Sequence, residues 1–242
     1  MERLNKFLAN AGICSRRKAD EHILAGDVSV NGVKIVELGH KIDPSTDQVE
    51  FQGNPVKLNN DFVYYVLNKP KGVVSTSSDE NGQKTVTDLV PKIPRVYPVG
   101  RLDKDTVGLI VLTNDGELTK ELTHPSFEHQ KEYEVEARII NFESRADKDL
   151  SSVISNKLTS GFKIDDKIME ADSVVVNEIR KNHIISMNLV LHTGYNRQIR
   201  KMCAKIGLEV TRLTRVGFAK LRLGALGLKP GEFKVILKTE II

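Results

Sequence analysis

The sequence predicts an α+β protein with two domains, a small one over residues 1–56 and a larger one over residues 57–242. Two observations support this division. The N-terminal residues carry two helical patterns followed by a hairpin signal, which together describe a compact unit. After a turn-rich linker, the chain alternates between β-branched strand patterns and short helical patterns. At 242 residues, the chain is long enough for a sizeable core, in one large domain or two.

Composition narrows the classes of function. Hydrophobic residues make up 40% and charged residues 28% of the chain, as in ordinary globular proteins, and the net charge of +4 permits an acidic partner. Aromatic residues make up only 5%, with no Trp, which argues against a broad base-stacking platform. Cys14 and Cys203 lie in no metal-spaced cluster, and no apolar leader or membrane-spanning run is present. We therefore expect a cytoplasmic protein with no metal, no cofactor and no membrane contact.

The small domain predicts two helices and a β-hairpin. An apolar pattern that starts at Leu4 indicates a first helix, which ends at Gly12. Ser15 is suited to cap a second helix over residues 16–25. The sequence VSVNGVKIV then places Asn31-Gly32, the strongest short hairpin signal, between two strand patterns.

Three cations, Arg16, Arg17 and Lys18, lie together at the start of the second helix. By composition alone they describe either a solvated helix face or a face that binds RNA phosphates. The order of a helix, the SRRKAD helix and the VNG hairpin resembles the alpha-L RNA-binding module, first described in a small-subunit ribosomal protein. This resemblance covers the first quarter of the chain, and it implies that the three cations bind RNA.

The larger domain is predicted from its periodicity. Its patterns indicate strands over residues 62–67, 107–112, 131–137, 171–179 and 184–191, and helices over residues 85–90, 117–123 and 142–154. A further helix follows HTGYNRQIR, and its apolar stripe includes Cys203, which we interpret as a packing thiol. The tail VTRLTRVGFAKLRLGALGLKPGEF predicts two short strands and a Gly-rich turn.

The stretch GRLDKDTVGLIVLTNDG places a short charged loop at the mouth of a buried strand. Its loop carries two carboxylates, Asp103 and Asp105, and it begins with Arg101. A rigid scaffold can present a working carboxylate from such a loop. The alternative is a surface ion pair between Arg101 and Asp103.

These residues resemble the GRLD motif of the pseudouridine synthases, in the group that includes the RsuA, RluB and RluF types. The resemblance implies that Asp103 is the catalytic carboxylate and that the catalytic domain is built on a mixed, mostly antiparallel sheet. It also implies isomerisation of a uridine in ribosomal RNA, on a base that has left its stack and without a cofactor. Whether Asp103 attacks the ribose as a nucleophile or removes a proton as a base stays open.

Two further stretches match motifs of this family. KPKGVVST, which contains Lys69, matches the first motif, which shapes the floor of the site and helps to receive the RNA backbone. KEYEV matches the K-x-Y motif, in which Tyr133 packs against the target base. From the residues alone, a lone Tyr on the apolar face of a strand is more often a core residue. The resemblance favours the functional role.

GYNRQIRKM resembles the last motif of the family at almost every defined position. Because the motif places an Arg there, we expect Arg200 to pair with Asp103 and to hold it ionised. The remaining cations of the site are expected to contact RNA: Arg101, Arg197 and Lys201. Two departures from the family pattern, Val107 and Tyr195, adjoin the motifs and bear on the choice of RNA site.

The GRLDKD loop and the EHQKEYEV strand look closest to the RluF and RluB types, which favours large-subunit ribosomal RNA. The expected partner is this RNA or a ribosomal assembly intermediate, bound by a monomer. Three alternatives stay open: a small-subunit RNA site, a non-catalytic ribosome-associated RNA-binding protein, and a glycoside hydrolase that uses Asp103 and Asp105.

Overall fold

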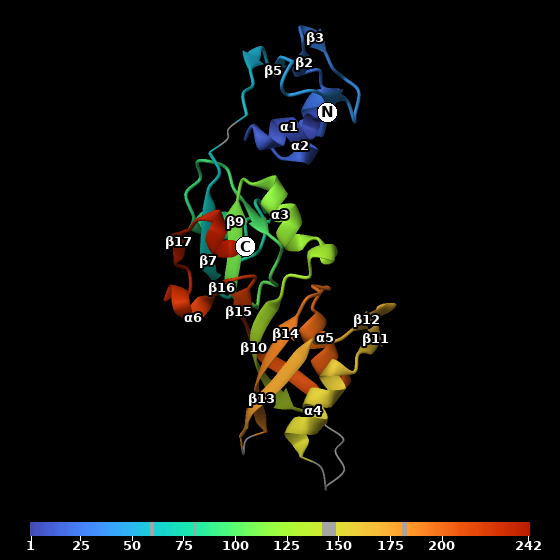
Figure 1. Ribbon diagram of the computed structural model, residues 1–242, viewed down its shortest axis with the longest axis vertical. Helices are drawn as coiled ribbons and strands as arrows, with labels where there is room; N and C mark the ends of the chain where they lie inside the picture. The colour runs from blue at the N-terminus through green and yellow to red at the C-terminus, as the bar shows by residue number, and fades with distance from the viewer. Residues whose placement is uncertain (59–60, 80, 142–148, 181–182) are drawn as a thin grey trace. The chain divides into compact units, whose positions relative to one another are not determined.

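A computed structural model of the chain describes residues 1–58, 61–79, 81–141, 149–180 and 183–242 (Figure 1). Its contacts form two compact units, which we describe separately. The N-terminal unit comprises Met1–Val63 with Ile93–Arg95 and Asn114–Gly116, and the larger unit comprises Tyr64–Lys92, Val96–Thr113 and Glu117–Ile242.

The N-terminal unit contains the predicted helices and hairpin. Its helices are α1 (Leu4–Asn10) and α2 (Arg16–Leu24). Its strands are β1 (Glu2–Arg3), β2 (Val28–Val30), β3 (Val33–Lys34), β4 (Lys41–Ile42), β5 (Val49–Phe51) and β6 (Asn54–Pro55). The side-chain oxygen of Ser15 accepts a hydrogen bond from the backbone N–H of Lys18 at 3.2 Å, which confirms the predicted cap. The hairpin between β2 and β3 turns at Asn31-Gly32, as predicted.

One mixed sheet organises the larger unit. In the described part of the chain, its strands follow the order β13-β14-β10-β15-β9-β7-β17, with β8 paired to β9 and β16 paired to β15. Their bounds are β7 (Tyr64–Lys69), β8 (Tyr97–Val99), β9 (Val107–Thr113), β10 (Lys131–Ile139), β13 (Ser173–Ile179), β14 (Ile184–Leu191), β15 (Leu208–Phe218), β16 (Leu221–Arg222) and β17 (Phe233–Val235). Only β9 and β15 pair in parallel among these neighbours. The predicted mixed, mostly antiparallel sheet is therefore confirmed.

The parallel pair needs a glycine at its contact point. Gly108 on β9 lies opposite Arg215 on β15. A Cβ atom at Gly108 would lie 2.3 Å from the backbone oxygen of Arg215, and the φ of +107° at Gly108 is one that other residues rarely adopt. This close approach brings β15 beside the strand that follows the charged loop.

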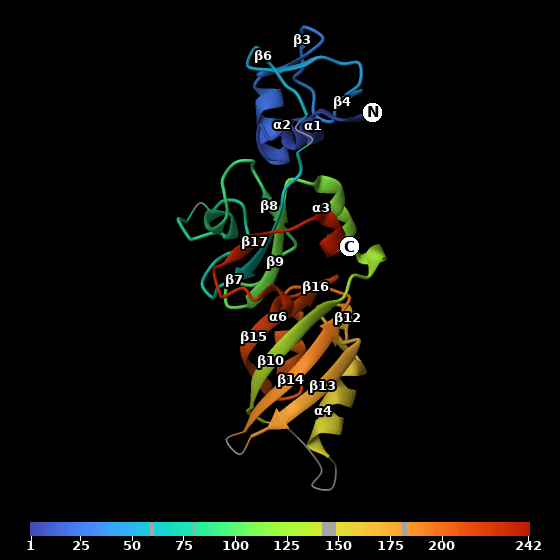
Figure 2. The same ribbon diagram turned by 60° about the vertical axis from the view of Figure 1, so that its left-hand side comes forward.

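Helices pack on the sheet. Those of the larger unit are η1 (Val86–Leu89), α3 (Gly116–Thr123), η2 (Pro125–Phe127), α4 (Leu150–Thr159), α5 (Gln198–Lys205), α6 (Leu223–Leu226) and α7 (Lys238–Ile241), and a small hairpin joins β11 (Phe162–Ile164) to β12 (Lys167–Met169). Figure 2 shows β10, β14 and β13 side by side, with α4 packed against them, while α5 contacts β15. Cys203 of α5 is fully buried, and burial raises the pKa of its thiol to about 12, which confirms its packing role.

Two predicted segments were wrong in part. The helix expected over residues 142–154 is observed as α4, which continues to Thr159, and Asp149 accepts hydrogen bonds from the backbone N–H groups of Ser151 and Ser152. Residues 142–148 lie outside the described residues. The tail forms the long strand β15 and then β16, α6, β17 and α7. Pairing with β10 on one side and β9 on the other stabilises β15 as a strand.

Across the residues that the structure describes, no helix combines the length and the apolar character needed to cross a lipid bilayer.

Candidate functional site

The predicted motifs meet in one cavity of the larger unit. This cavity has a volume of about 830 Å³, and Asp103, Tyr133 and Arg197 all line it. Asp103 comes from the loop between β8 and β9, Tyr133 from β10, and Arg197 from the residue that precedes α5. Arg101 is exposed and lines the same cavity. Segments separated by almost a hundred residues of sequence therefore form a single site.

The loop that carries Asp103 is held through its backbone. The hydroxyl of Ser75 donates to the carbonyl of Leu102 at 2.8 Å and accepts from the N–H of Leu102 at 3.0 Å. The N–H of Gly72 donates to the carbonyl of Lys104 at 2.8 Å. Hydrogen bonds thus fix the residues on both sides of Asp103, and the KPKGVVST segment forms the floor of the site. The sequence indicated this floor through its motif, but it did not identify Ser75.

Lys69 does not lie where we expected it. Its side chain is fully buried, and its ammonium group donates to the carbonyls of Pro70 at 3.2 Å, Val73 at 2.7 Å and Lys104 at 3.4 Å. An ammonium group enclosed in this way cannot reach an RNA phosphate, so the predicted RNA contact of Lys69 is wrong. Burial lowers the pKa of Lys69 to about 8, although the nearby charges of Asp105 and Asp103 oppose this shift.

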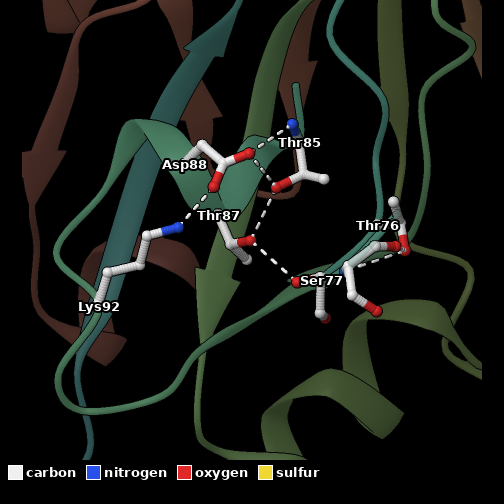
Figure 3. Close-up of polar contacts among 7 residues, drawn as sticks. Thr76, Ser77, Thr85, Thr87, Asp88 and Lys92 are labelled. Atoms are coloured by element: carbon white, nitrogen blue, oxygen red, sulfur yellow. Dashed lines mark hydrogen bonds and ion pairs between the residues drawn. The ribbon is translucent and has the colours of Figure 1, made fainter. Parts of the chain in front are cut away.

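A second network of hydrogen bonds connects η1 to Ser77, which follows the KPKGVVST segment (Figure 3). The hydroxyl of Thr87 donates to the carbonyl of Ser77 at 3.2 Å, which ties the end of the floor segment to η1. Asp88 accepts from the N–H and the hydroxyl of Thr85, both at 2.8 Å, and from Lys92 at 2.5 Å. Hydrogen bonds from Lys92 and Thr85 hold the pKa of Asp88 well below its usual range. This cap stabilises η1 and, through it, the floor.

The charged groups of the cavity pair differently from our prediction. Arg200 contacts Asp105 at 2.9 Å, whereas we expected it to pair with Asp103. The reason is that the guanidinium group of Arg200 also donates to the carbonyl of Val210 at 3.0 Å, which holds it beside Asp105. Arg197 instead lies 3.7 Å from Asp103 and 3.6 Å from Asp105. One arginine therefore bridges the two carboxylates and the other holds only Asp105.

Arg197 adopts an unusual backbone conformation. Its φ of 53° and ψ of 32° lie in the left-handed region, which costs a non-glycine residue about 1 kcal/mol or more. This conformation at the N-terminus of α5 directs the side chain over Asp103 and Asp105. At distances above 3.5 Å the contacts are ion pairs and not hydrogen bonds, and the side chain of Arg197 is 46% exposed. The guanidinium group is therefore loosely held at the mouth of the cavity.

The same pairing weakens the glycoside hydrolase hypothesis. That reaction needs a second carboxylate which acts as an acid or a nucleophile. Asp105 is instead engaged by two arginines. Within the described residues, no cluster of three or more His, Cys, Asp or Glu side chains could hold a metal ion.

The remaining predicted site residues differ in their surroundings, and among them only Tyr133 lines the cavity. Tyr133 is 9% exposed and lies opposite Arg215 in the pairing of β10 with β15, so it is a core residue that also faces the cavity. Lys201 pairs with Asp165 at 2.5 Å, away from the cavity lining. In the N-terminal unit, Arg16 and Arg17 are exposed on α2.

Known protein families and a solved structure are similar to this chain. A family model described as RNA pseudouridylate synthase matches residues 63–205, and a model of the S4 domain matches residues 2–49. The chain is 41% identical to ribosomal large subunit pseudouridine synthase B of Bacillus subtilis, over 100% of this chain and 94% of that protein. It is 35% identical to the dual-specificity RNA pseudouridine synthase RluF of Escherichia coli K12, over 99% and 77% of the two chains. A solved structure of a pseudouridylate synthase has the same fold, with a TM-score of 0.63 and 24% identity over 100% of this chain and 98% of that one.

Proposed function

The chain belongs to the RNA pseudouridylate synthase family, and from this premise we propose that it converts uridine into pseudouridine in large-subunit ribosomal RNA. The observation that carries the proposal is Asp103, which lines a cavity with a cationic mouth and lies between Leu102 and Lys104, whose backbone groups are hydrogen-bonded. The choice of the large subunit is supported by the 41% identity to an enzyme named for that substrate.

The target uridine must leave its stack before it reaches Asp103, at a cost of roughly a few kcal/mol. Tyr133 offsets part of this cost, because its ring lines the cavity and can pack against the uracil. Arg197 forms an ion pair with a phosphate of the RNA backbone. Its ion pairs with Asp103 and Asp105 are long, so a phosphate can replace them at little cost.

Asp103 then acts on the ribose of the target nucleotide. Either its carboxylate attacks the anomeric carbon, or it removes a proton from the adjacent carbon. In both routes the bond between N1 of the uracil and the ribose breaks, the uracil rotates within the cavity, and carbon 5 of the uracil bonds to the anomeric carbon, which releases Asp103 if the carboxylate had attacked there. Carbon 5 then loses its proton and N1 gains one, so the product is an isomer of the substrate. Arg200 supports this step indirectly, since it holds Asp105 and thereby the loop on which Asp103 lies.

The S4 domain supplies affinity. Arg16, Arg17 and Lys18 are all exposed and follow one another in the first turn of α2, a cationic surface that we call the α2 face. Contacts of this kind bind RNA through phosphates and give little base specificity. We propose that this face holds the ribosomal RNA while the cavity selects and converts the uridine.

The direct test maps pseudouridines in ribosomal RNA that was purified from cells lacking this protein. Incubation with the native chain should create pseudouridine at one or a few positions of the large-subunit RNA. Incubation with an Asp103→Asn variant should create none. Product confined to small-subunit RNA would contradict the proposed substrate, and absence of product from both RNAs would favour the non-catalytic RNA-binding alternative.

A further inference from the structure

Three rings form an exposed aromatic cluster between α3 and β10. This cluster consists of His124, Phe127 and His129. Phe127 is 50% exposed, and its ring lies within 15° of parallel to that of His129, with ring centroids 6.3 Å apart. His124 approaches the Phe127 ring edge-on, at 6.3 Å and 80°. A large apolar ring thus lies half exposed beside two imidazoles, although burial of such a ring is favoured.

The cluster is joined to the rim of the catalytic cavity. The ammonium group of Lys131 donates to the carbonyl of His129 at 3.1 Å and to the carbonyl of His192 at 2.6 Å. Two residues after His192, Gly194 lines the cavity. One half-buried lysine thus fixes the segment of the aromatic cluster against the segment that forms the cavity wall.

We propose that the aromatic cluster binds an unpaired RNA base next to the target uridine, by stacking on Phe127. This inference rests on the proposed function. Removal of the target base from its stack leaves its neighbours without a stacking partner, and single-stranded bases stack readily on Phe and His rings. The position beside the cavity rim suits a neighbouring nucleotide, and the cations of the cavity mouth suit the phosphates between them.

The chain contains no Trp, so Phe127→Trp creates a single fluorescent reporter in the cluster. Binding of a stem-loop RNA that contains the target uridine should quench this fluorescence through base stacking. Replacing one neighbour of the target by an abasic nucleotide should abolish the quenching, whereas abasic replacements at other positions should not. Phe233→Trp is the matched control, since Phe233 is 36% exposed on β17, at the other end of the sheet from β13. Its fluorescence should not respond.

Phe127→Ala provides the affinity measurement. It should weaken binding of the unmodified stem-loop about tenfold, and it should weaken binding of the abasic RNA no further. Circular dichroism should match the parent because the side chain is exposed. Equal affinity of Phe127→Ala and the parent, or quenching that ignores the abasic position, would overturn the inference. Pseudouridine formation by the parent is scored separately, so its failure would refute the proposed function alone.

Discussion

The catalytic cavity and the α2 face of the S4 domain both carry clusters of cations, but they use them differently. Beside the cavity lining, Lys69 is enclosed by three carbonyls, and Arg200 is bound to Asp105 and to a backbone carbonyl. On α2, Arg16 and Arg17 are exposed to solvent. Lys69 and Arg200 therefore position other groups, whereas Arg197 at the cavity mouth and the α2 cations are available to phosphate. The exposure of a cationic side chain and the groups that it already binds, and not its charge alone, indicate whether it supports the catalytic loop or binds RNA.

The largest expected effect on activity comes from a substitution in the cavity. Asp103→Asn should lower the rate of pseudouridine formation by about 10⁴-fold or more, because the amide can neither attack the ribose nor take its proton. RNA binding should persist, since phosphate contacts supply most of the affinity. Single-turnover assays and binding titrations measure the two effects. Asp166→Asn is the control, because Asp166 is exposed in the β11–β12 turn at a φ of 58° that Asn tolerates.

Lys69→Met tests whether a buried cation can matter without contacting RNA. The variant removes the donors that hold the carbonyls of Val73 and Lys104, so Asp103 should shift and the rate should fall about 100-fold. The dissociation constant for RNA should stay within about twofold of the parent. Lys84→Met, at an exposed lysine, should change neither quantity. Weaker RNA binding with an intact rate would return Lys69 to the RNA contacts.

Substitutions of Tyr133 test whether its ring stacks on the uracil or only packs in the core. Tyr133→Phe keeps the ring and should retain most of the activity, whereas Tyr133→Ala should lose roughly 30-fold in kcat/KM, because the uracil loses a stacking surface. Circular dichroism must show that the Ala variant is folded, since the residue is only 9% exposed. Activity of a folded Ala variant equal to the parent would make Tyr133 a core residue only.

The α2 face should account for a measurable part of the salt dependence of RNA binding. Replacing Arg16, Arg17 and Lys18 together by Ala should reduce the slope of log affinity against log salt by about two, since fewer counterions are released. The expected change is smaller than three because Lys18 already pairs with Glu21 at 2.7 Å. Binding titrations from low to high salt measure the slope. A slope identical to that of the parent would remove this face from RNA binding.

The smallest predicted effect concerns stability and pH. Lys69 has a pKa of about 8 in the folded chain and about 10.4 when unfolded, so between these values the unfolded state binds more protons. The free energy of unfolding of the parent should therefore rise with pH relative to that of Lys69→Met, by about 1–2 kcal/mol between pH 7.5 and 9.5. Urea titrations of both proteins measure the difference. A constant difference across this range would show that the ammonium group is not desolvated.

The sequence predicts the elements and the catalytic loop well, because both depend on local signals. Ser15 as a cap and Asn31-Gly32 as a turn act within a few residues of the chain, and both are observed. The GRLD match places Asp103 in the cavity with Tyr133 from β10. In these cases the interactions that decide the local structure are formed by residues within one short stretch of sequence.

The errors lie where distant segments decide the outcome. Asp103 and Asp105 are two residues apart, and the carbonyl of Val210 on β15 helps to hold Arg200 beside Asp105. The burial of Lys69 depends on Lys104, which lies 35 residues away. Phe127 belongs to no matched motif, and its stacked position depends on how Lys131 fixes the following segment.

The central claim is that the cavity performs the chemistry and the α2 face supplies affinity. One measurement tests it directly: the single-turnover rate of pseudouridine formation as a function of protein concentration, for the parent, Asp103→Asn and the triple Ala variant of Arg16, Arg17 and Lys18. The account predicts that the triple variant reaches the parental rate at high concentration and that Asp103→Asn reaches it at none. A reduced plateau for the triple variant, or a plateau for Asp103→Asn near that of the parent, would contradict this division.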